Sequence, residues 1–266
     1  MTTAWSGRRL LLVVAHPDDE TFGCGSLIAD AASGGADVTV CCATRGEAGE
    51  LVDGCELGGG TLADLRVREL QEAGGVLGAR AFELLDFVDS GMEGPAGSET
   101  LVGAPLESVV EAVTAVLDRV DPDVVVTLDP TGGDGHRDHV RIAEATTAAA
   151  RRRSSGASLY HWCIPRSVLL RWLERTREVN PDSGHLELDS STLGRPTEDI
   201  TTVLELAAHL DVRRAAIARH ASQRSPFEDM PDDLVHDFLT RDHLVRAEPP
   251  WPGGALETAL LVPDRR

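Results

Sequence analysis

The chain has 266 residues, and its 44 acidic side chains against 25 basic ones give a formal charge of −19. Such an acidic chain is a poor partner for nucleic acid or for an anionic membrane, because both attract basic surfaces. The sequence contains no lysine. This excludes P-loop NTPases, Schiff-base aldolases and pyridoxal-phosphate enzymes, whose chemistry requires a lysine amine.

Strand-like and helix-like segments alternate along the first part of the chain. The segments predicted as strands are residues 9–15, 37–43, 81–87, 123–128 and 159–164. The segments predicted as helices between and after them are 22–33, 61–77, 106–120, 140–153, 167–179 and 199–222, while 91–103 and 180–196 are predicted loops. Strands separated by helices of this length predict an α/β fold, with a Rossmann-like, mainly parallel sheet flanked by helices.

The composition, 42% hydrophobic residues, suits a globular protein with one large core, and we expect a single domain over residues 1–266. Its core is expected at 8–165, followed by a less regular, helical C-terminal region at 166–266. The longest apolar run, residues 10–15, is far shorter than the roughly 20 residues of a membrane span. Five cysteines without a CxxC pair indicate free thiols, and we expect a cytoplasmic protein.

A first polar cluster, His16-Pro17-Asp18-Asp19-Glu20, follows the first predicted strand directly. Open α/β sheets bind ligands at the carboxyl ends of their strands, so this cluster stands where a site is expected. A histidine and a carboxylate three positions apart can face one metal ion. The acids can also serve only to cap the following helix, but capping does not account for a histidine before a proline.

A second cluster occupies residues 129–139, after the fourth predicted strand, and contains His136, Asp138 and His139. Two strands that end in such turns would bring two imidazoles and a carboxylate to one crevice. This is the ligand set of hydrolytic zinc sites that keep an open coordination position.

Together these two clusters resemble the motifs of the LmbE-like, or PIG-L, zinc-dependent N-deacetylases, which remove acyl groups from amino sugars. Three further segments fit the resemblance, and they are Arg66–Leu70, Asp89–Met92 and Ala218–Gln223. The segment at 89–92 is similar to that of the mycothiol-pathway deacetylases and amidases. The resemblance spans roughly residues 8–245, most of the chain.

The resemblance implies a role for each motif residue. The metal ligands it implies are His16, Asp19 and His139. Asp18 would be the catalytic base, His136 would stabilise the oxyanion or act as an acid, and Asp138 would be an orienting partner in the catalytic group.

The resemblance also implies contacts to the substrate. Glu50, Arg66 and Asp89 match positions that hold the sugar and its surroundings in the mycothiol-pathway members. Asp134 stands where those members carry a tyrosine, so a tyrosine contribution to the oxyanion cannot be carried over. A carboxylate there can instead attract a cationic substrate, and we count Asp134 among the predicted substrate contacts.

The implied function is removal of an N-acyl group, N-acetyl above all, from a small amino sugar, its glycoside or a natural-product intermediate. The implied cofactor is Zn²⁺, although two histidines and an aspartate also accept Fe²⁺ or another divalent metal. Two alternatives are a zinc hydrolase of another amide or ester bond, as in mycothiol-conjugate amidases, and a non-catalytic, metal-containing sugar-binding module. A dehydrogenase is disfavoured because residues 23–28, which begin like a dinucleotide-binding glycine motif, end in Ile28 instead of a small residue. A serine esterase is disfavoured because no G-x-S-x-G motif occurs.

Overall fold

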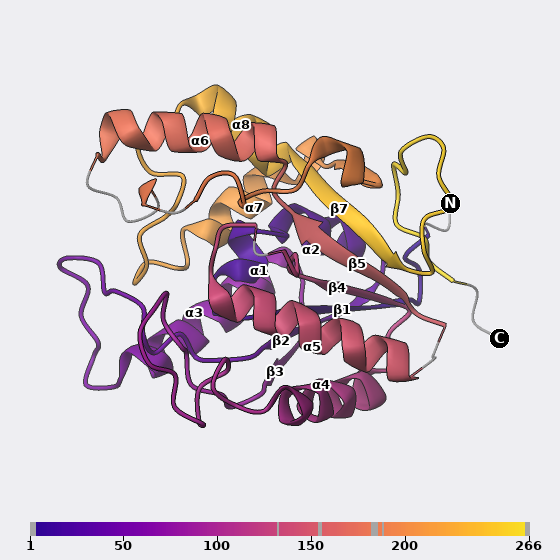
Figure 1. Ribbon diagram of the computed structural model, residues 1–266, viewed down its shortest axis with the longest axis horizontal. Helices are drawn as coiled ribbons and strands as arrows, with labels where there is room; N and C mark the ends of the chain where they lie inside the picture. The colour runs from indigo at the N-terminus through magenta and orange to yellow at the C-terminus, as the bar shows by residue number, and fades with distance from the viewer. Residues whose placement is uncertain (1–3, 132, 154–155, 182–185, 188, 264–266) are drawn as a thin grey trace.

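A computed structural model describes residues 4–263 except 132, 154–155, 182–185 and 188, and it shows a central sheet between two layers of helices (Figure 1). Its elements in chain order are β1 (Arg9–Val14), α1 (Asp19–Phe22), α2 (Gly25–Ser33), β2 (Asp37–Cys42), α3 (Leu62–Leu77), β3 (Ala81–Leu84), α4 (Leu106–Val120), β4 (Val124–Thr127), α5 (Arg137–Arg153), β5 (Ser158–Cys163), α6 (Arg166–Val179), the 3-10 turn η2 (Thr197–Asp199), β6 (Thr202–Glu205), the 3-10 turn η3 (Ala207–His209), α7 (Leu210–Ile217), α8 (Asp232–Thr240) and β7 (Arg241–Glu248).

The sheet has the strand order β3-β2-β1-β4-β5-β7-β6. The strands β1 to β5 are all parallel, whereas β7 runs antiparallel to both β5 and β6. The chain therefore builds outward from β1 in one direction, then returns to place β4 on the other side of β1. The carboxyl ends of β1 and β4 thus flank the switch point of the topology, where open α/β sheets bind their ligands.

The sheet interior consists of apolar strands that are covered on both faces. Residues 10–14 of β1 and 124–126 of β4 are fully buried, as expected of central parallel strands. In Figure 1, α4 and α5 lie together along one face of the sheet, and α2 lies on the other face. Because helices cover both faces of the sheet, the polar turns lie at the carboxyl ends of its strands.

Local sequence signals account for the long helices. Thr61 and Asp64 form a reciprocal capping box at the start of α3, and Gly78 ends that helix with a φ of 95°. The apolar side of α4 carries Val109, Val113 and Val116, which are buried at helical spacing. The α/β fold predicted from the alternation of strands and helices is confirmed.

Several boundaries in the first half differ from the prediction. The predicted helix at 22–33 is two helices, α1 and α2, interrupted at Gly23 and Cys24. An added Cβ at Gly23 would lie 2.7 Å from the Asp19 carbonyl oxygen, so the chain turns tightly at this point. The predicted strand at 81–87 ends at Leu84, and α5 begins at Arg137 instead of residue 140.

The less regular C-terminal region contains the helices α6, α7 and α8, but it also contributes two strands to the sheet, which were not predicted. The predicted helix at 199–222 is the short strand β6 followed by α7, and the region adds β7, which was not predicted, to the same sheet. The strand β7 lacks an apolar alternation because two of its buried positions are Asp242 and Arg246. Their charges are balanced by groups far away in sequence, Arg213 at 3.5 Å and Glu257 at 2.9 Å.

The other predictions about architecture concern membrane spans, the cysteines, the loop at 180–196 and the number of domains. No helix among the described residues combines the length and apolarity needed to cross a bilayer. All five cysteines are free. The predicted loop at 180–196 falls partly outside the described residues, and the single domain stays a prediction.

Candidate active site

The two predicted turns meet at the carboxyl edge of the sheet. His16 follows β1, and His139 lies in the first turn of α5, after β4. The Nε2 atom of His139 lies 3.3 Å from Nδ1 of His16. The carboxylate of Asp19 completes the group, because one oxygen lies 3.2 Å from His139 Nε2 and the other 3.6 Å from His16 Nδ1.

Each of these imidazoles has carboxylates on its other nitrogen. His16 Nε2 lies 3.3 Å from Asp138 Oδ2 and 3.5 Å from Asp89 Oδ1. His139 Nδ1 lies 2.9 Å from Asp134 Oδ2. A carboxylate at the outer nitrogen assigns the N–H to that side of the ring, so the lone pair of the inner nitrogen faces the centre.

The backbone holds the carboxylate of Asp19 in place. The N–H groups of Ala15 and His16 donate to Asp19 Oδ2 at 3.1 and 2.8 Å. Burial alone would raise the pKa of Asp19, but the charge of His139 and its hydrogen bond outweigh burial and lower it to about 2. Asp19 is therefore ionised throughout the physiological range.

Burial and the surrounding acids shift the pKa values of the two imidazoles in opposite directions. Burial alone would lower the pKa of His16, but hydrogen bonds to Asp138 and Asp89 outweigh it and raise the pKa to about 9. Burial likewise acts against the charge of His139, yet the charges of Asp134 and Asp19 raise its pKa. The acids around this centre thus favour positive charge within it.

The donor set fits a divalent metal ion. If the outer nitrogens carry the protons, then two lone pairs and an ionised carboxylate face one another at 3.2–3.6 Å, a repulsive arrangement that a cation relieves. The orphaned Oδ1 of Asp138, buried without a hydrogen-bond partner, adds to the negative potential. The ligand atoms of His16, His136 and His139, and of His16, Asp89 and Asp138, also lie within 4.8 Å of one another. The second of these sets uses the outer edge of His16, away from His139.

Asp18 stands beside this centre in a strained conformation. Its φ of 136° is rare for a residue other than glycine, and such strain costs about 1–3 kcal/mol. Asp18 starts α1 without a side-chain capping bond, so capping does not explain this carboxylate. Burial raises its pKa to about 6, against the opposing charge of Arg66.

Arg66 from α3 fixes the position of Asp18. Its Nη2 donates to Asp18 Oδ2 at 2.9 Å and to the Pro17 carbonyl at 2.8 Å, and its Nη1 donates to the Gly46 carbonyl at 2.9 Å. Gly46 has a φ of +70°, and a Cβ there would lie 2.2 Å from Nη1. The guanidinium therefore fits only because position 46 has no side chain.

His136 completes the inner face of the crevice. Its ring packs at a centroid distance of 4.5 Å from His16 and 5.0 Å from His139. The backbone N–H of Asp138 donates to its Nδ1 at 3.2 Å, which assigns the remaining proton to Nε2. Burial and the charges of the two other histidines lower its pKa to about 4. His136 is thus a neutral donor through Nε2.

The residues predicted to contact substrate lie in different surroundings. Glu50 is exposed on the loop after β2, and its backbone carbonyl accepts a hydrogen bond from Gln223 at 3.3 Å. Arg66, Asp89 and Asp134 instead contact Asp18, His16 and His139, respectively. The structure therefore brings together all the predicted residues except Glu50, whose side chain has no contact with the others.

Further residues support the turns around the centre, and among those described next only Glu47 lies outside the motif segments named in the sequence analysis. Glu47 Oε2 accepts a hydrogen bond from the Asp89 backbone N–H at 3.1 Å, and the Ser90 N–H donates to Asp138 Oδ2 at 2.9 Å. The predicted later element also supports the turns, because His220 Nε2 lies 2.8 Å from Glu20 Oε1. Glu20, Ser90 and His220 belong to the quoted motifs, whereas the sequence carries no comparable signal for Glu47.

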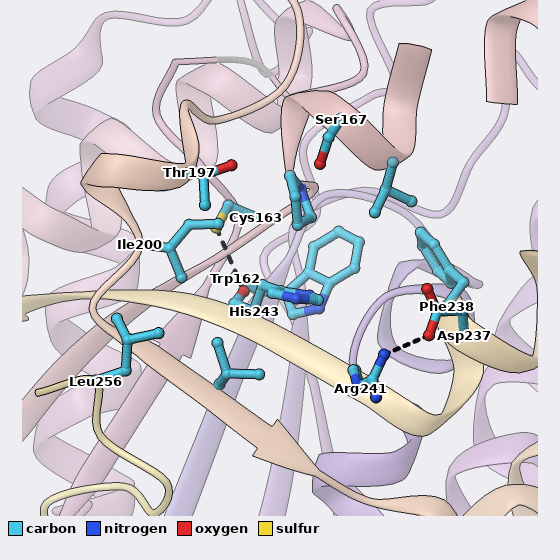
Figure 2. A pocket seen from close by; sticks show the side chains of 13 residues that line it. Trp162, Cys163, Ser167, Thr197, Ile200, Asp237, Phe238, Arg241, His243 and Leu256 are labelled. Atoms are coloured by element: carbon cyan, nitrogen blue, oxygen red, sulfur yellow. Dashed lines mark hydrogen bonds and ion pairs between the residues drawn. The ribbon is translucent and has the colours of Figure 1, made fainter. Parts of the chain in front are cut away.

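A separate cavity of about 180 Å³ lies between β5, β7 and the helices α6 and α8 (Figure 2). Trp162 and Phe238 line it, Arg241 pairs with Asp237, and the Cys163 thiol donates to the His243 carbonyl at 3.4 Å. Burial raises the pKa of Cys163, so its thiol is not a ready nucleophile. None of the predicted site residues lines this cavity.

Two imidazoles, an ionised carboxylate and a strained aspartate lie together at the topological switch point of the sheet. This arrangement is the one expected of a metal-dependent hydrolase. The sequence matches the family PIG-L, GlcNAc-PI de-N-acetylase, over residues 11–150, and the chain belongs to this family. The resemblance inferred from the motifs is thereby confirmed, and the protein is an enzyme of the deacetylase class.

Individual proteins show the same relationship. The 1D-myo-inositol 2-acetamido-2-deoxy-alpha-D-glucopyranoside deacetylase of Rhodococcus jostii (strain RHA1) is 35% identical over an alignment 268 residues long. The alignment covers 90% of this chain and 91% of that protein. The same name is given to a relative from Mycobacteroides abscessus, which is 36% identical over an alignment 270 residues long. This alignment covers 91% of this chain and 93% of that protein. Both matches extend well beyond the two motifs.

Solved structures confirm the fold. The N,N'-diacetylchitobiose deacetylase of Pyrococcus horikoshii matches with a TM-score of 0.56 and 20% identity, covering 87% of this chain and 75% of that one. At such identity the likeness shows the fold alone.

Proposed function

We propose that this protein removes the N-acetyl group from a small glycoside of 2-acetamido-2-deoxyglucose by metal-dependent hydrolysis. One observation carries the proposal: the inner nitrogens of His16 and His139 and the carboxylate of Asp19 converge beside Asp18, which is strained and held by Arg66. The names of the relatives from Rhodococcus and Mycobacteroides support the class of substrate.

The residues proposed to hold the metal are His16, Asp19 and His139, and zinc is the ion that we propose, because hydrolytic zinc sites use this type of donor set. Fe²⁺ or another divalent metal is also compatible with two imidazoles and a carboxylate. When bound, such an ion supplies Lewis acidity, which lowers the pKa of water toward 7 and polarises the acyl carbonyl. Asp138 and Asp89 would orient His16, and Asp134 would orient His139.

The remaining residues move protons and stabilise charge. Asp18 accepts a proton from water as the water oxygen attacks the acyl carbon, and Arg66 keeps its carboxylate aimed at that position. His136 donates from Nε2 to the oxygen on which negative charge develops. The proton held by Asp18 passes to the departing nitrogen as the C–N bond breaks. The products are acetate and a free amine.

Two supporting assignments belong to the same proposal. Glu50 is kept as a proposed substrate contact because its side chain is exposed and the preceding residue, Gly49, lies against Arg66. We also propose a cytoplasmic location, which the five free cysteines support. A non-catalytic sugar-binding module is disfavoured, because metal binding alone requires neither the strain at Asp18 nor its bond to Arg66.

The test is an assay of purified, zinc-loaded protein with a panel of N-acetylglucosamine glycosides and cysteine-bearing amides. We expect acetate and primary amine to appear in equal amounts from the glycosides, and a chelator to stop their release. Mass spectrometry of the products identifies the bond that is broken. Cleavage confined to another amide or ester would favour the amidase alternative, and metal content without any turnover would favour the binding module.

Asp134→Ala is expected to weaken zinc binding by about 10- to 100-fold, the usual cost of losing a group that orients a metal-binding histidine. The reason is the 2.9 Å contact to His139 Nδ1, which fixes the ring and its tautomer. Competition with a chromophoric chelator measures the dissociation constant. If the KM for substrate rose while zinc affinity stayed the same, then Asp134 would be a substrate contact, as the sequence predicted.

A further inference from the structure

Arg137 occupies an electrostatically unfavourable position. It is the first residue of α5, and the N-terminus of a helix carries partial positive charge that repels cations. The neighbouring residues His136, Asp138 and His139 all contact His16 or Asp19. No role was assigned to Arg137 from the sequence, so its contacts must explain its presence.

The side chain of Arg137 gathers the carbonyl groups of one loop. Its Nε donates to the Gly91 carbonyl at 2.8 Å, and its Nη1 donates to that of Gly94 at 2.8 Å. Its Nη2 donates to the carbonyls of Ser90 and Glu93. Four carbonyls of residues 90–94 therefore converge on one planar guanidinium, a geometry that a lysine ammonium cannot reproduce.

The loop backbone is shaped for this convergence. Gly91 and Gly94 have φ values of 63° and 92°, in the left-handed region that glycine tolerates best. These two positions turn the carbonyls of residues 90–94 inward, toward α5. The side chain of Arg137 satisfies acceptors that would otherwise require water.

The first residues of the clamped loop contact residues of the candidate metal centre. The next residue of α5, Asp138, accepts the Ser90 N–H at 2.9 Å and contacts His16 Nε2 at 3.3 Å. Asp89, at the start of the loop, lies 3.5 Å from the same nitrogen. Arg137 thus fixes the segment whose first residues help to hold His16.

We propose that Arg137 is a positioning residue for the metal centre: by clamping residues 90–94, it holds Asp89 and Ser90 where they orient His16. This inference rests on the proposed function only in taking His16 as a metal ligand. It does not depend on which substrate is cleaved.

The test compares Arg137→Ala and Arg137→Lys with Arg152→Ala. Arg152 is a matched control because it lies near the other end of α5 and donates to Glu107 Oε2 at 2.8 Å, away from residues 89–94. Hydrogen exchange of the peptide that contains residues 89–94 reports the clamp, and chelator competition reports zinc affinity. Neither readout requires a substrate.

We expect Arg137→Ala to accelerate exchange at residues 90–94 by at least about tenfold, as local opening becomes easier, and to weaken zinc binding by about 10- to 100-fold. Arg137→Lys should restore these values only in part. Arg152→Ala should leave exchange at 90–94 and zinc affinity unchanged. With active enzyme, kcat should fall more than KM rises.

Three results would overturn the proposal. They are unchanged exchange at 90–94 in Arg137→Ala, faster exchange there with wild-type zinc affinity, and full recovery in Arg137→Lys. If Arg137→Ala does not fold, the comparison of Arg137→Lys with Arg152→Ala decides between the same outcomes. Failure of every substrate in the deacetylation assay, with these binding results as expected, would count against the proposed function alone.

Discussion

Replacing Asp18 by asparagine is expected to lower kcat by about 10²- to 10⁴-fold, the range that a general base contributes. The amide has nearly the same shape as the carboxylate, so asparagine meets the same backbone strain at the φ of 136° as aspartate does. Zinc binding and folding should therefore survive. The variant cannot take up the proton of the attacking water, so the loss should fall on the chemical step.

Steady-state kinetics of zinc-loaded protein measure this loss, with zinc content and thermal unfolding as checks. The matched control is Asp37→Asn, because Asp37 also pairs with an arginine, Arg80, at 3.3 Å. That pair is exposed at the start of β2, at the opposite end of the strands from the crevice, and its loss should leave kcat unchanged. Wild-type turnover in fully loaded Asp18→Asn would remove Asp18 from the mechanism.

The position of this site could be predicted because its signals are local. The apolar runs before His16 and Asp129 predict buried parallel strands, which the structure confirms as β1 and β4. Since such strands present their carboxyl ends on one edge, the two motifs had to lie near each other if the strands were neighbours. The direct pairing of β1 with β4 supplies that condition.

The missed features depend on partners distant in sequence. The buried positions of β7 include Asp242 and Arg246, which lack the apolar alternation of a strand and are stabilised by Arg213 and Glu257. An arginine in a sequence likewise does not reveal its acceptors, so the clamp formed by Arg137 required coordinates. Asp134 differs in that its partner His139 is close in sequence, but their contact is set by the fold of the turn before α5 and also required coordinates.

Deleting the imidazole of His139 is expected to affect metal binding more than any change to a carboxylate that orients it. His139→Ala should weaken zinc binding by more than the roughly 10- to 100-fold loss expected for such a carboxylate. The inner nitrogen of His139 lies 3.3 Å from His16 Nδ1 and 3.2 Å from Asp19, so its removal leaves only two of the three proposed ligands. Deacetylation should fall to background.

Metal removal and return separate this loss from unfolding. A chelator should stop amine release by the wild-type protein, and added Zn²⁺ should restore it, whereas His139→Ala should stay inactive at the same zinc concentration. The control is His209→Ala, which removes a partly buried imidazole that contacts Asp30 at 3.3 Å, outside the crevice. Because His209 contributes no atom to the centre, zinc affinity and turnover should match the wild type. Stoichiometric, tight zinc in His139→Ala would show that the ion is held by other residues, the outer set of His16, Asp89 and Asp138 being the alternative that the geometry offers.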